Sequence, residues 1–534
     1  MSAQALLKRF DIVADHSGNI PALRRLVVDL AVRGKLLRTD ELDIDVQEML
    51  RRISKKVGEL TLAGLIKKQK PLAKIGNDEV PAAYLAHCAF ARLGNIANLQ
   101  KGLTGIQSSM PGEFPLVVTA AERGTCDHFD FDGAAAIIPL VSSTGHGNAS
   151  INRLHYQDGK FALGTILCAV IPFDEQLISA RFLYEYLTAF KEELLVSKMI
   201  GTANVTLTLG KIAEVPVPII APAVQRRVDE LMALCDQLEA AQQERERRRD
   251  SLAAASLQRL NQPATDITAE TQREHARFHL QHLPRLTTRP EHIKALRAAI
   301  LDLAVRGKLV SQEAGDQPTA EAIPLFEFDG VLHSIPQSWF WASLGQLADM
   351  VTDGEHLTPP RIVERQIPLV TAKNVRDGEM DYSATDWVSN ETAEKAWRRC
   401  RPTVGDILMV CVGATTGRLC ILRKQHDMVL VRSVAVIRPS CRVCVDFLAL
   451  AIRSPVGQRQ IWSSVKVTAQ PCLYINRINS LAIPLPPLAE QHRIVAKVDE
   501  LMTLCDQLEA QLTTTQTDSS RLLEAVLEAA LAPA

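Results

Sequence analysis

The feature that most constrains this chain is a duplication inside it. The motif DELMALCDQLEA occupies residues 229–240, and DELMTLCDQLEA, which differs at one position, occupies residues 499–510. A second motif, DLAVRGKL, occurs without change at residues 29–36 and 302–309. Both pairs of copies lie about 270 residues apart, so the duplicated unit includes the long stretch between the two motifs. The sequence therefore predicts two like halves in tandem.

Length and composition set further limits. The 534 residues leave room for about three or four domains of roughly 150 residues each. A net charge of −1 excludes a chain-wide basic excess, so binding to nucleic acid would depend on local patches. Eleven cysteines without a signal-peptide pattern favour a reducing cytoplasm. No apolar run approaches the roughly 18 residues of a membrane span. The longest runs, at 134–141 and 166–173, predict buried strands.

The DLAVRGKL motif lies in a predicted amphipathic helix at Ile20–Leu37 and again at Ile293–Val310. Helix packing alone would need only the apolar positions to recur. Polar positions recur as well, which favours a specific docking surface, with internal packing as the alternative. The recurring polar residues are Asp29, Arg33, Lys35, Asp302, Arg306 and Lys308.

The middle of each half, residues 80–220 and 335–486, consists of short β-branched and aromatic runs separated by glycine and proline, which predicts strands and turns. Each middle opens with a related phrase, ARLGNIAN at 91–98 and ASLGQLAD at 342–349. The interiors have diverged. We therefore expect an α/β architecture with two pseudo-symmetric globular domains that share a fold and differ in their surface residues.

A long helix is predicted after each middle, at residues 221–262 and 487–534. In the second helix, apolar residues recur at three- and four-residue steps, which is the spacing of a coiled-coil seam. Residues 1–79 are expected to form an N-terminal helical segment with the first docking helix. Residues 263–290 are expected to be a linker bounded by prolines, and residues 291–334 the repeated docking helix with a connector.

Motifs for catalysis and cofactor binding are missing. The chain has no GxxxxGK[ST] loop, no HExxH and no GxGxxG after a strand, so nucleotide hydrolysis and dinucleotide chemistry have no support. The asparagine-proline-proline-aromatic motif of an adenine methyltransferase is also absent. Cys441 and Cys444 form a lone CxxC without a second pair at zinc spacing. We expect no catalytic residue, no cofactor and no metal ion.

Two polar loops, one in each middle, are candidates for recognition. SSTGHGN at 142–148 either presents polar side chains or is an ordinary turn. GATTGR at 413–418 has two glycines that let the backbone approach a partner closely, and an arginine that could reach a phosphate or a guanine edge. The candidate DNA contacts are Ser143, Thr144, His146, Asn148, Lys373, Asn374, Thr415, Thr416, Arg418 and Gln470.

Local charge separates the two middles. Residues 335–486 contain 18 Lys and Arg against 13 Asp and Glu, whereas residues 81–220 contain 9 against 12. A DNA surface is therefore expected readily in the second middle. In the first it would have to be a small basic or polar face on an acidic domain.

With the segment PLPPLAEQHRIVAKVDELMTLCDQLEA at residues 484–510, the chain resembles the specificity subunit of type I restriction–modification enzymes over nearly its whole length. IPLPPLAEQ ahead of a long helix and the paired DLAVRGKL segments are typical of that family. The resemblance implies two target-recognition domains that each read one half of a bipartite, asymmetric DNA site. It also implies that the two long helices form an antiparallel coiled coil, which sets the distance between the domains.

The resemblance implies partners as well. Two modification subunits, which carry S-adenosylmethionine and methylate adenine in double-stranded DNA, would dock on the repeated segments, and motor-nuclease subunits would join them. The chain itself would be a non-catalytic subunit. It departs from a strict repeat at one place, because four residues are missing between Gln225 and Asp229 relative to Gln491 and Asp499. From this we expect the first long helix to begin later than the second.

One rival hypothesis keeps the architecture and changes the function. A two-headed coiled-coil scaffold that binds proteins would need the same helices and the same pair of divergent domains. It predicts no sequence-selective binding to DNA, and that binding is the property that separates the two hypotheses.

Overall fold

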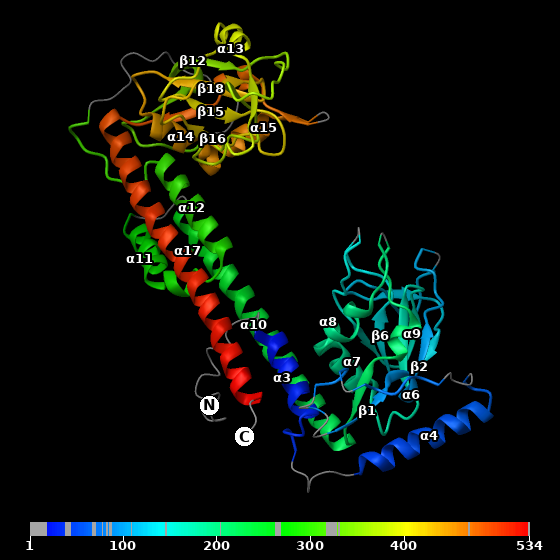
Figure 1. The fold of residues 1–534 in the computed structure, drawn as a ribbon. Coiled ribbons are helices and arrows are strands. Elements are labelled where there is room, and N and C mark those ends of the chain that lie inside the picture. Colours follow the sequence, from blue (N-terminus) through cyan, green and yellow to red (C-terminus); the bar gives the residue numbers. More distant parts are fainter. Residues whose placement is uncertain are drawn as a thin grey trace. The chain divides into compact units, whose positions relative to one another are not determined.

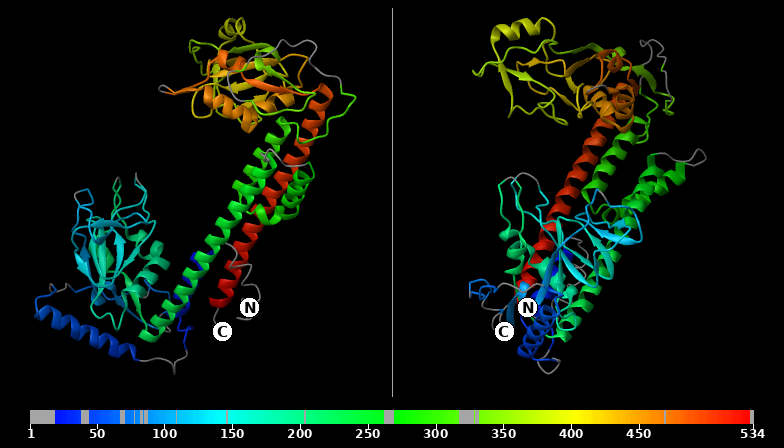
Figure 2. Two further views of the ribbon diagram at one scale, coloured as in Figure 1. Left: turned by 180° about the vertical axis from the view of Figure 1, so that it is seen from behind. Right: turned by 90° about the vertical axis from the view of Figure 1, so that its right-hand side faces the viewer.

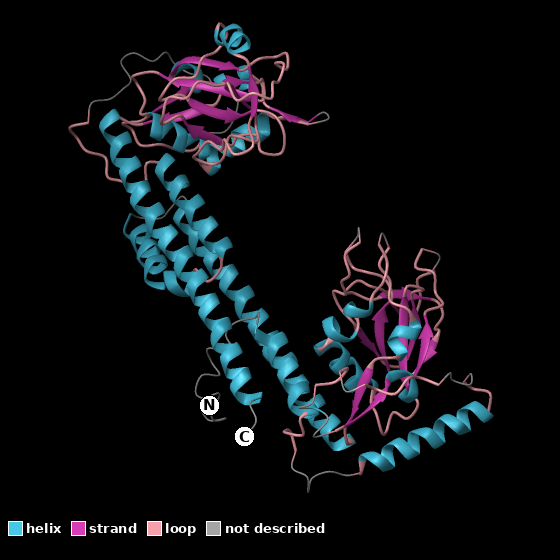
Figure 3. Ribbon diagram, in the orientation of Figure 1, coloured by secondary structure: helices cyan, strands magenta, loops and turns pink. Residues whose placement is uncertain are grey.

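The computed structural model describes residues 19–37, 44–66, 71–76, 78–81, 84, 88–107, 109–144, 147–202, 204–261, 269–316, 328, 332–467 and 470–531. The chain divides into two compact units, Met1–Glu246 with Gln516–Ala534, and Arg247–Thr515. Each unit contains a globular α/β domain, which carries the strands seen in Figure 3, together with long helices. No helix among the described residues is both long and apolar enough to cross a membrane.

The first domain is built from two small sheets. Its strands are β1 (Ala89–Arg92), β2 (Ala97–Lys101), β3 (Phe114–Val117), β4 (Gly124–Cys126), β5 (Phe131–Asp132), β6 (Ala135–Pro139), β7 (His155–Gln157), β8 (Lys160–Leu163), β9 (Leu167–Pro172) and β10 (Pro216–Ile219). One sheet has the antiparallel order β2-β9-β6-β7, and the other has the order β4-β3-β8-β5 with β3 and β8 parallel. β1 pairs with β10, so the start of the domain is joined to its end.

The second domain repeats this order. Its strands are β11 (Phe340–Ser343), β12 (Ala348–Asp353), β13 (Ile367–Val370), β14 (Asp386–Val388), β15 (Ile407–Val410), β16 (Leu419–Ile421), β17 (Val429–Leu430), β18 (Val434–Pro439) and β21 (Ala482–Leu485). The sheets are β12-β18-β15-β16 and β14-β13-β17, with β13 and β17 parallel, and β11 pairs with β21. No strand of the second domain corresponds to β5 among the described residues, and the other strands named here follow one order in both halves, as the duplicated motifs predict.

The apolar runs of the sequence are strands buried on both faces. In β6, Ala136 and Ile138 belong to the core beneath helix α7 (Ala180–Ala189), whereas Ala135 and Ile137 belong to a separate cluster on the other face. β15 divides its residues between two clusters in the same way. Because neither face meets water, these strands lack the alternation of a half-exposed strand. The predicted buried strands at 134–141 and 166–173 are confirmed as β6 and β9.

The two repeated motifs lie in helices that pack on one another. In the first unit these helices are α3 (Ile20–Val32) and the start of α10 (Pro222–Asn261), and in the second unit they are α12 (Pro290–Val305) and the start of α17 (Leu488–Leu531). Buried side chains from both helices of each pair belong to one cluster. α12 and the start of α17 lie side by side in Figures 1 and 2.

An arginine joins the helices of each pair at equivalent positions. Arg24 of α3 donates to Asp236 at 2.6 Å and to Glu239 at 3.0 Å on α10. The counterpart contacts run from Arg297 of α12 to Asp506 at 2.7 Å and to Glu509 at 2.8 Å on α17. We call this three-residue contact the arginine clamp. Because the clamp occurs in both units, the two motifs were duplicated together with the contact between them.

The glycine of the DLAVRGKL motif ends each helix. Gly34 has a φ of +64° and Gly307 a φ of +66°, a backbone region that glycine enters without a steric penalty. The next amide, that of Lys35 or Lys308, donates back to Leu30 or Leu303 at 2.9 and 3.0 Å. This is the hydrogen bonding of a glycine C-cap, so the glycine recurs for a backbone reason.

A buried glutamine anchors each domain to its long helix. Gln225 accepts a hydrogen bond from the amide of Ser179 at 2.8 Å and donates to the carbonyl of Leu177 at 2.8 Å. Gln491 accepts from the amide of Cys444 at 2.7 Å and donates to the carbonyl of Pro486 at 3.0 Å. Both glutamines are almost fully buried, so these bonds fix where each helix leaves its domain.

The prediction that the first long helix begins later is wrong. α10 begins at Pro222 and α17 at Leu488, the same place relative to the anchoring glutamine. The four missing residues therefore lie inside the helix, between Gln225 and Asp229. They shorten the path from the glutamine anchor to the repeated motif by about one helical turn.

The segment predicted as a linker contains a helix. α11 (Ala269–Leu286) occupies most of residues 263–290, and His279 of α11 lies 2.9 Å from the hydroxyl of Ser256 on α10. Both side chains are buried. The sequence did not predict this helix, because the segment is polar and only a few of its side chains are buried. In the N-terminal segment the described helices are α3 and α4 (Val46–Leu62), in line with the predicted helical character.

Pairing of the two long helices along their length stays a prediction. Within the first unit, Leu23 of α3, Leu238 of α10 and Leu523 of α17 share a small apolar cluster. Asn19 also donates to the hydroxyl of Ser519 at 3.4 Å. Segments of both long helices therefore meet at α3.

The glutamine anchor can be tested by replacing Gln491 with alanine. The change leaves the part-buried amide of Cys444 without its acceptor and removes the buried hydrogen bond to Pro486, which costs about 1–3 kcal/mol of unfolding free energy. All five tryptophans lie between residues 339 and 462, so their fluorescence during urea unfolding reports on the second domain. Gln507, exposed on the same helix, is the matched control, and its alanine variant should unfold like the parent chain. Equal stability of the two variants would contradict the anchoring role.

Candidate functional site

The two candidate loops follow equivalent strands. Residues 140–150 follow β6 and residues 411–418 follow β15, and these strands hold the same position in the two sheets. The backbone bonds that hold each loop also correspond. Ser142 N donates to Val205 O and Leu207 N to Leu140 O, each at 2.9 Å. In the second domain, Gly413 N donates to Pro471 O and Leu473 N to Cys411 O, also at 2.9 Å. The loops therefore occupy equivalent sites with different side chains.

The loop of the first domain presents polar side chains on a braced backbone. Ser142 Oγ donates to the carbonyl of Asn148 at 2.6 Å, and Ser143 Oγ accepts from the amide of Asn152 at 3.0 Å. Ser143, Thr144 and Asn148 are exposed. His146 lies outside the described residues. Side-chain hydrogen bonds thus hold the described part of the loop, and its exposed hydroxyl and amide groups can donate or accept hydrogen bonds.

The loop of the second domain depends on two glycines. Gly413 and Gly417 have φ values of +99° and +90°, and a Cβ on Gly417 would lie 2.8 Å from the side chain of Gln458. Thr416 is 3% exposed and donates to Gly413 O at 2.8 Å, so it shapes the loop from inside. Thr415 and Arg418 are half-buried. The hairpin of β19 (Lys466–Val467) and β20 (Pro471–Cys472) places exposed Gln470 beside this loop.

A third segment carries Lys373 and Asn374. Asn374 is 1% exposed, accepts from the amide of Thr371 at 2.9 Å and donates to the carbonyl of Asp381 at 3.0 Å. Its polar atoms brace the turn, which is not the position expected of a base-reading side chain. Lys373 is about half exposed, and its ammonium lies 3.6 Å from Asp386. Direct contact with DNA stays a prediction for both residues.

Ser433 forms hydrogen bonds both with the turn that carries Lys373 and Asn374 and with the loop at residues 411–418. Its hydroxyl accepts from the amide of Ala372 at 3.3 Å, and its carbonyl accepts from the amide of Cys411 at 2.8 Å. The two segments follow the carboxyl ends of β13 and β15, which belong to different sheets. The fold therefore links the segments that carry Lys373, Arg418 and Gln470, although they are distant in sequence.

A cavity of about 460 Å³ beside the hairpin was not foreseen from the sequence. Arg399 donates to Asp353 at 2.6 Å in its wall, and His356 lies 3.1 Å from the same carboxylate. Arg432 and Tyr474 also line it, and Tyr474 is 48% exposed. An exposed ring next to arginines suits stacking on a base and contact with phosphate. The lining residues come from five separate segments, so no sequence motif predicts the cavity.

The first domain has a basic hollow of about 410 Å³ with Arg123, Arg153 and Arg181 in its lining. Arg123 lies 3.0 Å from Nδ1 of His155. Burial lowers the pKa of His155 to about 4, and the two neighbouring arginines, Arg123 and Arg153, add to the effect. The ring is therefore neutral at pH 7, and the positive charge comes from the arginines. This hollow is the kind of local basic face that an acidic domain needs to approach DNA.

The repeated polar residues are mostly engaged inside each unit. Asp29 and Asp302 are each 4% exposed, and they accept hydrogen bonds from Arg33 at 3.0 Å and from Arg306 at 2.8 Å. The Tyr84 hydroxyl donates to Asp29 as well. These contacts support the packing alternative for the aspartates and arginines. Lys35 and Lys308 are exposed, and docking through them stays a prediction.

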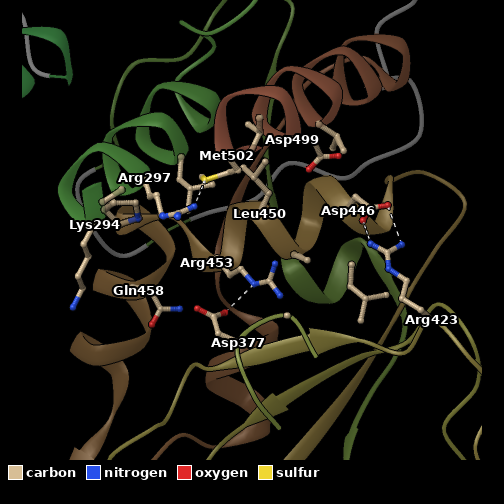
Figure 4. A pocket seen from close by; sticks show the side chains of 18 residues that line it. Lys294, Arg297, Asp377, Arg423, Asp446, Leu450, Arg453, Gln458, Asp499 and Met502 are labelled. Carbon is tan, nitrogen blue, oxygen red and sulfur yellow. Dashed lines mark hydrogen bonds and ion pairs between the residues drawn. The ribbon is translucent and has the colours of Figure 1, made fainter. Parts of the chain in front are cut away.

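A groove of about 610 Å³ in the second unit lies against the repeated helix (Figure 4). α12 contributes Lys294 and Arg297, and α17 contributes Asp499 and Met502. Helix α14 (Val445–Arg453) forms another wall, where Arg453 pairs with Asp377 at 3.3 Å and Asp446 accepts from Arg423. That hydrogen bond raises the pKa of the Arg423 guanidinium. The groove thus offers both charges and apolar surface between recurring helices.

Comparison with known proteins agrees with the resemblance. The family model described as "Type I restriction modification DNA specificity domain" matches residues 370–515. The type I restriction enzyme EcoEI specificity subunit of Escherichia coli is 26% identical and covers 96% of this chain and 94% of its own length. The EcoAI specificity subunit of Escherichia coli is 24% identical, with coverage of 96% and 94%. One solved structure concerns complex assembly and conformational transition of the type I R-M system. Its chain is 17% identical, the match covers 83% of the present chain and 97% of the solved one, and the TM-score is 0.49.

The different positions of Asn374 and Lys373 give a testable contrast. Replacing Asn374 with alanine should lower the unfolding free energy of the second domain by about 1–3 kcal/mol, because buried backbone groups lose their partners. The Lys373→Ala variant should stay within about 0.5 kcal/mol of the parent chain, as for an ordinary surface residue. Tryptophan fluorescence during urea unfolding measures both variants. A large loss for Lys373→Ala, or none for Asn374→Ala, would contradict this description of the turn.

Proposed function

Because the chain belongs to the specificity subunits of type I restriction–modification enzymes, we propose that it recognises a bipartite, asymmetric DNA sequence, with one half read by each globular domain. The observation that carries the proposal is the pair of equivalent loops. Identical backbone bonds hold residues 140–150 and 411–418 in place, while their side chains differ. Two domains of one fold with unlike loops suit two unlike half-sites.

The contacts divide into two kinds. Phosphate contacts position a protein on the duplex, and contacts to base edges specify the sequence. In the second domain, Lys373, Arg399 and Arg432 are suited to phosphate, whereas Thr415, Arg418 and Gln470 offer groups for base edges. In the first domain the exposed residues Ser143, Thr144 and Asn148 are suited to base edges, and the arginines of the basic hollow to phosphate. Asn374 and Thr416 support the loops from within.

The chain acts as a recognition subunit and catalyses no reaction itself. Two modification subunits would supply S-adenosylmethionine and adenine methylation, and motor-nuclease subunits would supply cleavage. The groove between α12, α14 and α17 is a second candidate docking surface beside Lys35 and Lys308, because it combines charge with apolar lining on the recurring helices. We place the complex in the cytoplasm, which agrees with eleven free cysteines.

The two long helices are proposed to set the distance between the half-sites. α10 has 40 residues and α17 has 44. At 1.5 Å per residue such helices are about 60–65 Å long, enough to separate two DNA-reading surfaces by more than a turn of duplex. The rival hypothesis, a protein-binding scaffold, would use the same helices. The relatives are named as specificity subunits, so they do not support that hypothesis.

Recognition should be modular. Replacing residues 335–486 with the corresponding domain of a relative should change one half-site and leave the other unchanged, because each domain has its own sheets and its own loops. Methylome sequencing of a host that carries the chimaera and the modification subunit reads both half-sites together. The matched replacement of residues 80–220 should change only the other half-site. A change in both half-sites from either replacement would contradict the proposal, and the absence of a methylated motif for the parent chain would favour the scaffold.

A further inference from the structure

Three side chains with metal-binding atoms meet at the end of β4. Cys126 is the last residue of the strand and is fully buried, whereas Asp127 and His128 in the turn that follows are about half exposed. The Cys126 sulfur lies 3.4 Å from His128 Nδ1 and 3.7 Å from Asp127 Oδ1, and the latter two atoms are 2.8 Å apart. Among the described residues this is the only such group of three.

These separations fit the ligands of one small ion. With zinc bonds of about 2.3 Å to sulfur and about 2.0–2.1 Å to nitrogen or oxygen, two ligands of a tetrahedral site lie roughly 3.3–3.6 Å apart. The two distances from the sulfur are close to that range. The shorter distance from nitrogen to oxygen would have to open by about half an ångström, a movement that half-exposed side chains permit.

Hydrogen bonds hold the far side of the His128 ring. Nε2 lies 3.0 Å from the hydroxyl of Thr104, and that hydroxyl donates to Asp130 at 2.8 Å. When Thr104 donates to Asp130, its oxygen can accept from Nε2–H, and this tautomer turns the Nδ1 lone pair towards Asp127 and Cys126.

In that tautomer Nδ1 and Asp127 Oδ1 are two acceptors 2.8 Å apart, and a cation between them removes their repulsion. The Cys126 sulfur lies within reach of the same cation. A divalent metal ion uses all three atoms, and thiolate with imidazole is the ligand chemistry of zinc. The chain from His128 through Thr104 to Asp130 also has the form of the outer hydrogen bonds that orient metal-bound histidines. Asp130 is 6% exposed and accepts from the amide of Leu163 at 2.8 Å, so the chain ends on the β-sheet.

We propose that the first recognition domain binds a zinc-like divalent cation through Cys126 Sγ, Asp127 Oδ1 and His128 Nδ1, with a fourth position open to solvent. The amide of Asp127 donates to Met110 O at 3.0 Å, so the ion would tie the turn after β4 to the loop between β2 and β3. The site is structural and does not depend on how the domain reads DNA. Three adjacent residues lack the spaced pairs of a zinc motif, so no motif in the sequence predicts this site.

The test is metal binding by the full chain without an affinity tag. After dialysis against zinc and removal of loosely held metal, atomic emission should find one more zinc ion per chain in the parent than in His128→Gln. The exposed position of His128 makes this variant compatible with folding. Cobalt in place of zinc should give the near-ultraviolet absorption of a thiolate–cobalt bond, and Cys126→Ser should abolish it.

Matched controls come from the second domain. His356 pairs with Asp353 at 3.1 Å without a cysteine, and Cys441 is an exposed thiol outside the group of three. His356→Gln and Cys441→Ser should bind as much zinc as the parent chain. The proposal is overturned if the parent binds no zinc, if His128→Gln keeps the extra ion, or if bound cobalt shows no thiolate absorption. A parent without metal would leave the three side chains with only the hydrogen bonds between them.

Discussion

The apolar seam between the two repeated motifs, together with its arginine clamp, is the contact on which the rest of the structure depends. The carboxylates of the clamp are 47–70% exposed, so each ion pair alone contributes roughly 0.2–1 kcal/mol. The larger contribution comes from the apolar side chains beside it, such as Val28 and Met232, because burying such a side chain is worth about 1.5–3 kcal/mol. The apolar seam therefore holds the helices together, and the clamp selects one register among those the seam would tolerate.

The clamp and the glutamine anchor together position each recognition domain. The anchor fixes the domain to its long helix, and the clamp fixes that helix to the DLAVRGKL helix. Four fewer residues separate anchor and clamp in the first unit than in the second. The first domain is therefore about one turn, or about 6 Å, nearer to its clamp, with a rotation of about 40° left over from four residues at 100° each. The two units are alike in their parts and unlike in this one spacing.

The duplication made much of the fold predictable, because two copies of a pattern identify which positions matter. Repeated motifs, buried strands and two like domains were all foreseen. The sequence did not predict α11 because most of its side chains are polar. The start of α10 was predicted wrongly because the sequence does not show whether the four missing residues lie before the helix or inside it. The polar residues and glycines of the sequence predicted the two candidate loops, and their contact with DNA stays a prediction. The sequence could not tell that Asn374 and Thr416 point inward, and it missed Arg432 and Tyr474, because burial and long-range contacts arise only once distant strands are adjacent.

The most direct test of this account restores the missing turn. Inserting the four residues Arg-Ile-Val-Ala after Gln225, as they stand in the second copy at 493–496, lengthens the anchor-to-clamp path by about 6 Å and keeps the apolar seam nearly in phase. Duplex DNA rises about 34 Å per ten base pairs, so this length corresponds to at most about two base pairs. Mapping the methylated motif of the variant with its modification subunit should show both half-sites unchanged and the gap between them altered by one or two base pairs. A folded, active variant with an unchanged gap would contradict the account.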